Sequence, residues 1–347
     1  MKAIKIVSKG VAEIQDVPIP KLRDGYVLVK VKAVALNPTD WKHIDYMATP
    51  GATVGCDYVG IIEAVGDKVD VPWKKGDRVA GFTHGANEVE PEDGCFAEYS
   101  MARAGVGAKV PDSMTNEDAA TLGVGITTVG QSLYQSLGLP LPGSGMKAGF
   151  PILIYGGSSA TGTLAIQYAR LSGCSPIITT CSPRNFDLVK SLGADAVFDY
   201  HDPDCVQKIR EYTNGTLMHV LDCIANGPTI DICSAALSTG GKVAYLLSSA
   251  KHTREDVQPS HPLAYTAMGE YFRFSVAKKE YPARPEDYEF GKMFWALSEK
   301  LIANGQIRPH PAQVGGGGLK GVFDGLQAMR EGKVSGAKLV YRIEETP

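Results

Sequence analysis

Residues 152–170 read ILIYGGSSATGTLAIQYAR, a hydrophobic run that passes through a Gly/Ser-rich turn into an amphipathic segment. This order predicts a strand, a tight turn and a helix whose first backbone amides point at a bound anion. Read as G-x-G-x-x-G, the turn spans Gly157 to Gly162, with Ser159 in place of the middle glycine. We expect a dinucleotide pyrophosphate to lie slightly further out, with the hydroxyls of Ser159 and Thr161 joining the amides as donors. Taken alone, the turn is equally consistent with a plain strand–helix connection.

The sequence around this turn alternates short apolar runs with helical periods. The runs are PILIYGG at 151–157, PIITTCS at 176–182 and AVFDY at 196–200. Such alternation predicts an α/β fold with a doubly wound parallel sheet and helices on both faces. The first third of the chain instead holds short β-type runs closed by Gly, Pro or Asp, which favours an antiparallel, β-rich domain.

The end of the second strand carries the signal for the type of coenzyme. NAD-specific enzymes have an Asp or Glu there for the ribose 2′-hydroxyl, whereas this chain has Ser182, Pro183, Arg184 and Asn185. A hydroxyl and a guanidinium hold a 2′-phosphate through charge-assisted hydrogen bonds, and a carboxylate would repel it. The residues therefore predict NADPH. The alternative is that Ser182 caps the following helix and Arg184 is simply solvated.

The remaining pattern predicts one domain interrupted by the other. We expect residues 1–120 and 275–347 to form the β-rich catalytic domain and residues 121–274 to form the nucleotide domain. The closing run AKLVYRI is expected to rejoin the first domain as a strand. Residues 251–285 show no clear period, and Gly315 to Gly318 are interpreted as a flexible connector because no strand is predicted directly before them.

Composition narrows the classes of protein further. The chain has 347 residues, 44% of them hydrophobic, and a net charge of −3 without a basic cluster, which argues against a nucleic-acid partner. The start has no signal-peptide pattern and no window is apolar enough for a membrane helix, so we expect a soluble, cytoplasmic protein without a membrane partner. Seven cysteines without a CxxC pair argue against a disulfide framework and against a structural zinc site.

Three segments in the first third of the chain read VKAVALNPTDWK (31–42), VGCDYVGIIEAVGDKV (54–69) and KKGDRVAGF (74–82). They resemble segments of the medium-chain dehydrogenase/reductase superfamily, specifically its zinc-free, quinone-reductase-like branch. A narrower resemblance, to fungal trans-acting enoyl reductases that partner polyketide synthases, is carried by IYGGSSAT (154–161), the run 179–200 and MREGKVSGAKLVYR (329–342). The resemblance implies a Rossmann domain beside a GroES-like antiparallel domain.

The same resemblance bears on metal. Zinc enzymes of the superfamily use a Cys near the NPTDWK segment, a Gly-His-Glu, and four closely spaced cysteines elsewhere. In this chain the position of the first Cys falls among Asn37 to Asp40, and the Gly-His-Glu is replaced by Gly55-Cys56-Asp57. Where the four closely spaced cysteines would be expected, the chain has only Cys95. We therefore predict no metal. His43, His84 and Cys56 are more often core or surface groups than ligands when they occur singly.

By residue-by-residue match, the resemblance also implies the site. The residues expected around NADPH are Thr39, Asp40, Trp41, Lys42, Ser159, Ala160, Thr161, Gly162, Ser182, Pro183, Arg184, Asn185, Tyr200, Leu246, Leu247, Ser335 and Gly336. The residues expected to face an acyl chain are Val129, Gly130, Gln131, Ser132, Leu133, Tyr134, Gln135, Ser136, Tyr271, Phe272, Arg273, Phe274 and Ser275.

Catalytic roles follow for two residues. Lys42 is expected to contact the nicotinamide ribose or the substrate oxygen, the alternative being a surface lysine. Thr128 is placed at the start of a helix lining the nicotinamide pocket, the alternative being an N-cap. Tyr46 and solvent both stay open as the proton source.

The sequence is consistent with three functions. The first is an NADPH-dependent, zinc-independent, trans-acting enoyl reductase that reduces the α,β-double bond of a polyketide thioester on a synthase acyl carrier domain, with a monomer favoured over a dimer. The second is a free-standing quinone or alkenal reductase for small diffusible substrates, which would share every cofactor residue. The third is a non-catalytic NADPH-binding protein.

Overall fold

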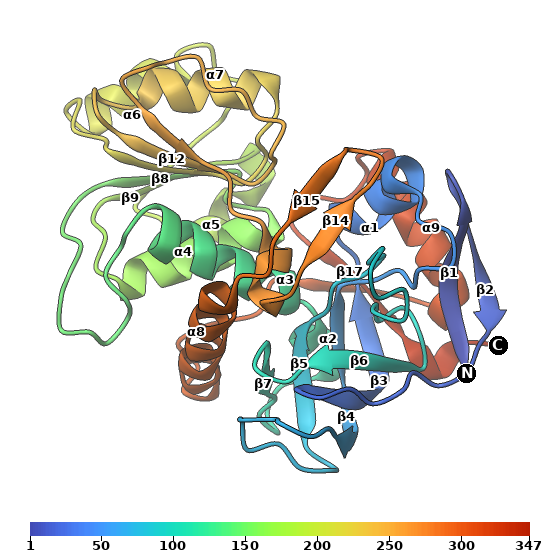
Figure 1. The fold of residues 1–347 in the computed structure, drawn as a ribbon. Helices are drawn as coiled ribbons and strands as arrows, with labels where there is room; N and C mark the ends of the chain where they lie inside the picture. Colours follow the sequence, from blue (N-terminus) through green and yellow to red (C-terminus); the bar gives the residue numbers. More distant parts are fainter. The chain divides into compact units, whose positions relative to one another are not determined.

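The computed structural model describes every residue from Met1 to Pro347, and the chain folds into two units (Figure 1). Unit 1 contains Met1–Thr127 and Tyr265–Pro347, and unit 2 contains Thr128–Ala264. Residues 121–127 and 265–274, which the sequence assigned to the nucleotide domain, lie in unit 1. The reason is packing: Tyr265 and Phe272 are buried against the ring of His84 in that unit.

Unit 2 contains a six-stranded parallel sheet in the order β10-β9-β8-β11-β12-β13, which confirms the predicted Rossmann-type fold. The strands are β8 (Ile152–Tyr155), β9 (Ile177–Thr180), β10 (Ala196–Phe198), β11 (His219–Asp222), β12 (Lys242–Tyr245) and β13 (Gln258–Ser260). From β8 the chain adds β9 and β10 on one side of the sheet and then β11, β12 and β13 on the other, so the strand order reverses between β8 and β11. Ligands of doubly wound sheets bind at the carboxyl ends of the strands at such a switch point.

Helices cover both faces of this sheet. Figure 1 shows α6 and α7 over one face and α4 and α5 over the other. Their bounds are α4 (Ala160–Leu171), the short 3-10 turn η3 (Pro183–Asn185), α5 (Phe186–Ser191), α6 (Cys205–Tyr212) and α7 (Gly227–Ala236). Because both faces are covered, β8 and β9 are buried along their whole length, which explains why they read as continuous apolar runs.

Unit 1 is built on a seven-stranded sheet in the order β16-β17-β3-β4-β5-β7, with β6 paired to β3. Its strands are β3 (Tyr26–Ala35), β4 (Asp57–Val65), β5 (Arg78–Phe82), β6 (Tyr99–Arg103), β7 (Gly107–Lys109), β16 (Ala312–Gly315) and β17 (Lys338–Arg342). Strand β17 pairs antiparallel with β3, Val340 opposite Ala35, so the closing strand rejoins the first domain as predicted. Two antiparallel pairs complete the unit: β1 (Lys2–Ser8) with β2 (Val11–Asp16), and β14 (Phe272–Phe274) with β15 (Lys279–Tyr281).

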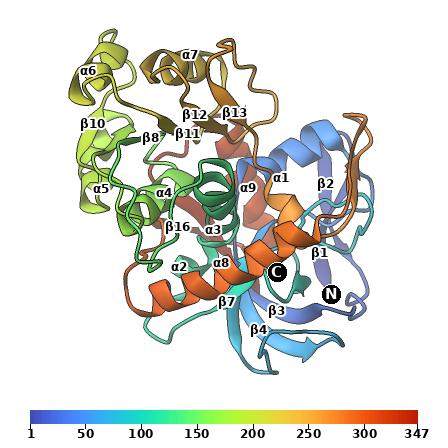
Figure 2. The same cartoon turned by 60° about the vertical axis from the view of Figure 1, so that its left-hand side comes forward.

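The helices of unit 1 pack around this sheet. They are α1 (Pro38–Lys42), the π-helical turn η1 (His43–Met47), α2 (Asn116–Ala120), η4 (Ala264–Met268), α8 (Pro285–Ala303), α9 (Gly318–Arg330) and η5 (Ile343–Glu345). Helix α3 (Gly123–Val129) contains the boundary between the units and continues into η2 (Gly130–Ser136). Figure 2 shows α8 running past β7, and the Lys109 N–H donates to Glu299 Oε2 of that helix at 2.7 Å.

The interpretation of Gly315 to Gly318 as a flexible connector is wrong. Strand β16 pairs with β17 and ends at Gly315, the first of these glycines. Helix α9 begins at Gly318, the last of them. A Cβ on Gly315 would lie 2.4 Å from the ring of Tyr341, so the glycine allows close packing. The strand was missed because four residues are too few to show a strand pattern, and the segment depends on its neighbour for pairing.

Candidate active site and nucleotide-binding turn

The turn between β8 and α4 is held by Ser159, the N-cap of the helix. Its hydroxyl donates to the Gly156 carbonyl at 2.7 Å and accepts from the Gly162 N–H at 3.1 Å. Since a hydroxyl has one hydrogen to donate, the expectation that Ser159 donates to a phosphate through its side chain is wrong for this conformation. A Cβ on Gly162 would lie 2.3 Å from the Gly156 carbonyl oxygen, so the turn closes only with glycine at that position.

The first amides of α4 are nevertheless available to an anion. The N–H groups of Ala160 and Thr161 precede the first intrahelical hydrogen bond, which runs from the Thr163 N–H to Ser159, and make no other backbone bond. The hydroxyl of Ser158 accepts from Asn185 Nδ2 at 3.2 Å, which ties the turn to the end of β9. Two unpaired amides at the N-terminus of a twelve-residue helix fit a pyrophosphate group.

The end of β9 brings together the residues expected at the 2′-phosphate. Ser182 precedes η3 but makes no side-chain capping bond, and its hydroxyl lies 3.4 Å from that of Tyr200. Arg184 is exposed to solvent. Tyr200 is half-buried, with its ring 4.0 Å from that of His201. Leu246 and Leu247 follow β12 and are also half-buried.

In unit 1, α1 presents the residues of the NPTDWK segment. Lys42 is half-buried, its ammonium lies 5.7 Å from the Trp41 ring centroid, and burial lowers the pKa of the ammonium. Asp40 points inward: it is 2% exposed and its carboxyl accepts from the Asn37 N–H at 2.6 Å, so this side chain faces the interior of unit 1. Burial, opposed by the Asn37 hydrogen bond, raises the pKa of the Asp40 carboxyl to about 7.

A buried ion pair lies directly beneath α1. Lys338 Nζ is 2.6 Å from Asp57 Oδ2 and donates to Asn37 Oδ1 at 2.7 Å. The other Asp57 oxygen accepts from the Val124 N–H at 2.6 Å, at the start of α3. A carboxylate at a helix N-terminus complements the helix dipole. The pair thus joins β4, β17 and two helices of the site region. The predicted cofactor residues Ser335 and Gly336 lie just before Lys338 in the chain; Ser335 is exposed, and the φ of Gly336 is 67°.

Tyr265 is a residue of this region that the sequence did not indicate. His43, His84 and Cys56, expected only as isolated groups, all meet around its ring. The His84 ring stacks on it at 4.0 Å, the His43 ring meets it edge-on at 5.7 Å, and Cys56 Sγ lies 3.7 Å from its hydroxyl. The segment 251–285 has no periodicity that could have shown that Tyr265 is buried.

The residues expected to face an acyl chain divide into buried and exposed groups. All of 129–134 are buried, whereas Gln135 is exposed and Ser136 half-buried. Thr128 lies one residue before the end of α3, not at its start, and is 8% exposed, so the N-cap alternative is excluded. Tyr46, one of the two open proton sources, is 56% exposed.

The second expected substrate segment forms the β14–β15 hairpin. Tyr271 is 41% exposed, and Phe272 and Phe274 pack with their rings 5.5 Å apart. Glu88 anchors the hairpin: it pairs with Arg273 Nε at 2.7 Å and accepts from the Ser275 N–H at 2.9 Å.

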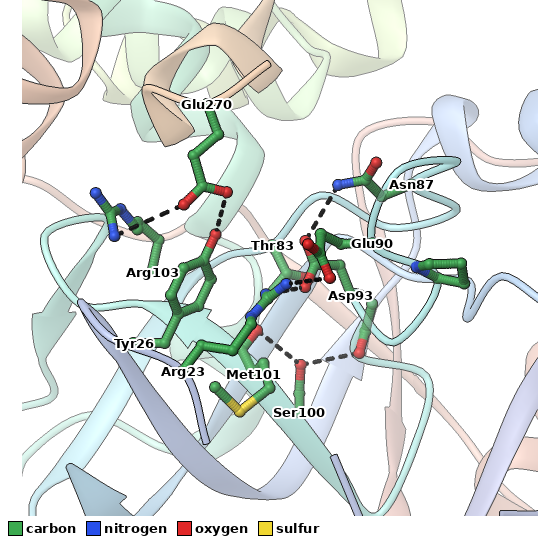
Figure 3. Close-up of polar contacts among 12 residues, drawn as sticks. Arg23, Tyr26, Thr83, Asn87, Glu90, Asp93, Ser100, Met101, Arg103 and Glu270 are labelled. Carbon is green, nitrogen blue, oxygen red and sulfur yellow. Dashed lines mark hydrogen bonds and ion pairs between the residues drawn. The ribbon is translucent and has the colours of Figure 1, made fainter. Parts of the chain in front are cut away.

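A further polar network, drawn in Figure 3, fixes the chain between η4 and this hairpin. Tyr26 is buried and its hydroxyl donates to Glu270 Oε2 at 2.6 Å. The Arg23 guanidinium lies 4.2 Å from the Tyr26 ring centroid and pairs with Glu90 at 2.8 Å and with the buried Asp93. Burial, opposed by Arg23, raises the pKa of Asp93 to about 7. This network is structural, because its charged groups pair with one another.

Two features are absent from the structure. No group of three or more His, Cys, Asp or Glu residues is arranged to hold a metal ion. No helix combines the length and apolar character needed to cross a membrane.

Comparisons with known proteins agree with this architecture. Residues 23–112 match the alcohol dehydrogenase GroES-like domain, and residues 160–270 match the zinc-binding dehydrogenase domain. A solved mycobacterial protein, Rv1454c complexed with NADPH, superposes with a TM-score of 0.76 at 23% identity, covering 99% of both chains. The fold and turn therefore define a medium-chain dehydrogenase/reductase, a class that uses a nicotinamide cofactor.

Two curated relatives define the family. The chain is 48% identical over 345 residues to the trans-enoyl reductase ACTTS2 of Alternaria alternata, covering 99% of both chains. It is 47% identical over 360 residues to the trans-enoyl reductase resD of Aspergillus sclerotiorum, covering 99% of this chain and all of the relative. The chain belongs to the trans-enoyl reductase family of this superfamily, which confirms the resemblance seen in the sequence.

Proposed function

We propose that the protein is a zinc-independent, NADPH-dependent trans-acting enoyl reductase. Its substrate is an α,β-unsaturated polyketide thioester on the acyl carrier domain of a separate synthase. The observation that carries this proposal is the 48% identity, over 99% of both chains, to a trans-enoyl reductase. No cluster of side chains that could hold a metal ion is present, which supports zinc independence. The oxygen of the thioester must then be polarised by side chains.

Bound NADPH supplies a hydride to the β-carbon of the enoyl group, and the α-carbon takes a proton. The Ala160 and Thr161 amides bind the pyrophosphate, because they face no acceptor of their own. Ser182 and Arg184 bind the 2′-phosphate, since the segment after β9 offers one hydroxyl and one exposed guanidinium, and the residue between them is Pro183 and not a carboxylate. The Lys42 ammonium on α1 forms no ion pair, and partial burial lowers its pKa. That ammonium polarises the thioester oxygen.

The purified protein tests this directly with a crotonyl thioester on a holo acyl carrier protein, with loss of the reduced-nicotinamide absorbance as the readout. We expect turnover of the thioester with NADPH and, under the same conditions, little turnover of a simple quinone. Oxidation with the quinone alone would support the rival reductase. No oxidation with any acceptor, alongside tight NADPH binding, would support a non-catalytic binder.

Replacing Arg184 with alanine tests the coenzyme preference. We expect KM for NADPH to rise roughly 10- to 100-fold, the value of one charge-assisted hydrogen bond to a phosphate. KM for NADH should stay unchanged, since NADH has no 2′-phosphate. Lys190→Ala is the matched control: it removes an exposed positive charge from α5, where its ammonium lies 5.9 Å from the Phe186 ring. An equal rise of KM for both coenzymes in Arg184→Ala would contradict the assignment.

A further inference from the structure

Tyr265 makes a polar contact that its packing does not require. The residue is 5% exposed, and its ring is already fixed by the stacked His84 and by Phe82 at 5.7 Å. Its hydroxyl lies 2.7 Å from Thr39 Oγ1, on the helix that carries Lys42. This is the only hydrogen bond of normal length to that hydroxyl, because the sulfur of Cys56 is a weak partner at 3.7 Å.

The tautomer of His43 follows from its neighbours. His43 Nδ1 lies 2.9 Å from the Thr39 carbonyl oxygen, which can only accept, so Nδ1 carries the hydrogen. The same nitrogen lies 3.1 Å from Thr39 Oγ1, so its one hydrogen is shared between the carbonyl and the hydroxyl oxygen, and the Thr39 hydroxyl has no acceptor in Nδ1. Burial lowers the pKa of His43, so the ring is neutral and Nε2 is a bare acceptor.

These contacts fix the direction of the Thr39 hydroxyl. Its oxygen accepts from His43 and lies at short distance from the Tyr265 hydroxyl. When Tyr265 donates, Thr39 accepts two hydrogen bonds and its own hydrogen is left for an acceptor outside the network. In the reverse direction Tyr265 would have to donate to the distant sulfur of Cys56, which is the weaker arrangement. Accepting two bonds also polarises the Thr39 hydroxyl and makes it a stronger donor.

We propose that Tyr265 is a positioning residue that holds the half-exposed Thr39 hydroxyl as a hydrogen-bond donor to the thioester oxygen as it gains negative charge. The inference rests on the proposed enoyl reductase function and deepens it. Thr39 is then a catalytic residue beside Lys42, and Tyr265 acts through it. Donors that are fixed before the reaction stabilise a developing oxyanion better than donors that must reorient. Thr39 and Lys42, three residues apart on one helical segment, lie on the same side of that helix.

The test is a double-mutant cycle of Tyr265→Phe and Thr39→Val, measured as kcat for the crotonyl thioester. Tyr265→Phe keeps the stacked ring and removes only the hydroxyl. We expect kcat to fall about tenfold, the value of one neutral hydrogen bond. Thr39→Val should lower kcat roughly 100-fold, as loss of an oxyanion donor does. Adding Tyr265→Phe to Thr39→Val should then change nothing further, because the group that Tyr265 positions is gone.

Further readouts separate positioning from stability and from cofactor binding. The dissociation constant of NADPH, measured by its fluorescence, should stay within about twofold in Tyr265→Phe. Thr39→Ser should retain most of the activity because it keeps the hydroxyl. Tyr26→Phe is the matched control, since it removes a buried hydroxyl with one short hydrogen bond in the same unit (Figure 3). It should shift the urea midpoint as Tyr265→Phe does and leave kcat unchanged.

The outcomes distinguish this inference from the proposed function. Wild-type kcat in Tyr265→Phe, or additive losses in the double variant, would overturn the positioning role while leaving the enoyl reductase intact. A wild-type protein that reduces no enoyl thioester would overturn the proposed function and this inference with it.

Discussion

Replacing Lys338 with methionine will lower the free energy of unfolding by about 3–5 kcal/mol, because removing one partner of a buried ion pair leaves the other charge uncompensated. Lys338 is 4% exposed, and its partner Asp57 is fully buried. Methionine fills a similar volume but offers no hydrogen to Asp57 or to Asn37. Urea unfolding followed by tryptophan fluorescence measures the change.

Two companion variants make the Lys338 result specific. The double variant Lys338→Met/Asp57→Asn should recover much of the loss, since no buried charge is then left unpaired. Lys75→Met breaks an exposed ion pair with Glu63, 3.5 Å long, and should change stability by less than about 1 kcal/mol. A small effect of Lys338→Met, similar to that of Lys75→Met, would contradict the buried-pair argument.

Asp40→Asn is expected to change how stability depends on pH. Burial raises the pKa of Asp40 to about 7 from 3.8, so the folded state holds a proton that the unfolded state has released between about pH 4 and pH 7. The wild type therefore loses stability as pH rises through that window. Asparagine has no proton to lose and its carbonyl can still accept from the Asn37 N–H.

The variant and the wild type should therefore be similarly stable near pH 4 and diverge above it. Since one pKa unit corresponds to about 1.4 kcal/mol, the variant should be more stable by about 4 kcal/mol above pH 7. Urea unfolding at a series of pH values across the window measures the slope. The exposed Asp112 serves as control, because Asp112→Asn removes a carboxylate that is not desolvated. Parallel pH profiles for wild type and Asp40→Asn would contradict the prediction.

The parts of the fold that follow from local sequence were predicted correctly, and the parts that depend on distant partners were not. The strand, turn and helix at 152–170 were predicted because strand hydrophobicity, glycine and helical period lie next to one another. Strand β16 was missed because its only support is pairing with β17. The role of Ser159 as an internal cap was also missed, because a serine in a turn can donate inward or outward and the sequence does not say which.

The candidate site shows the same division. The resemblance indicated Thr39 and Lys42 through a contiguous motif, but gave no sign of Tyr265, which reaches Thr39 across 226 residues of sequence. The Lys338 ammonium was likewise inconspicuous in a run of ordinary strand residues. Both contacts join segments that only the folded chain brings together, and no local period encodes them.

The discontinuity of unit 1 has a consequence for how the protein is made. Unit 2 is one continuous stretch and is complete when Ala264 has left the ribosome. Asp57, made early, is paired only with Lys338, whose ammonium also donates to Asn37, 301 residues earlier in the chain. During nearly the whole of translation the N-terminal sheet therefore carries a buried-type carboxylate without its counter-charge and a strand, β3, without its neighbour β17. Such half-finished sheets are the species that aggregate or recruit chaperones, so biosynthesis of this chain is most vulnerable just before its last strand emerges.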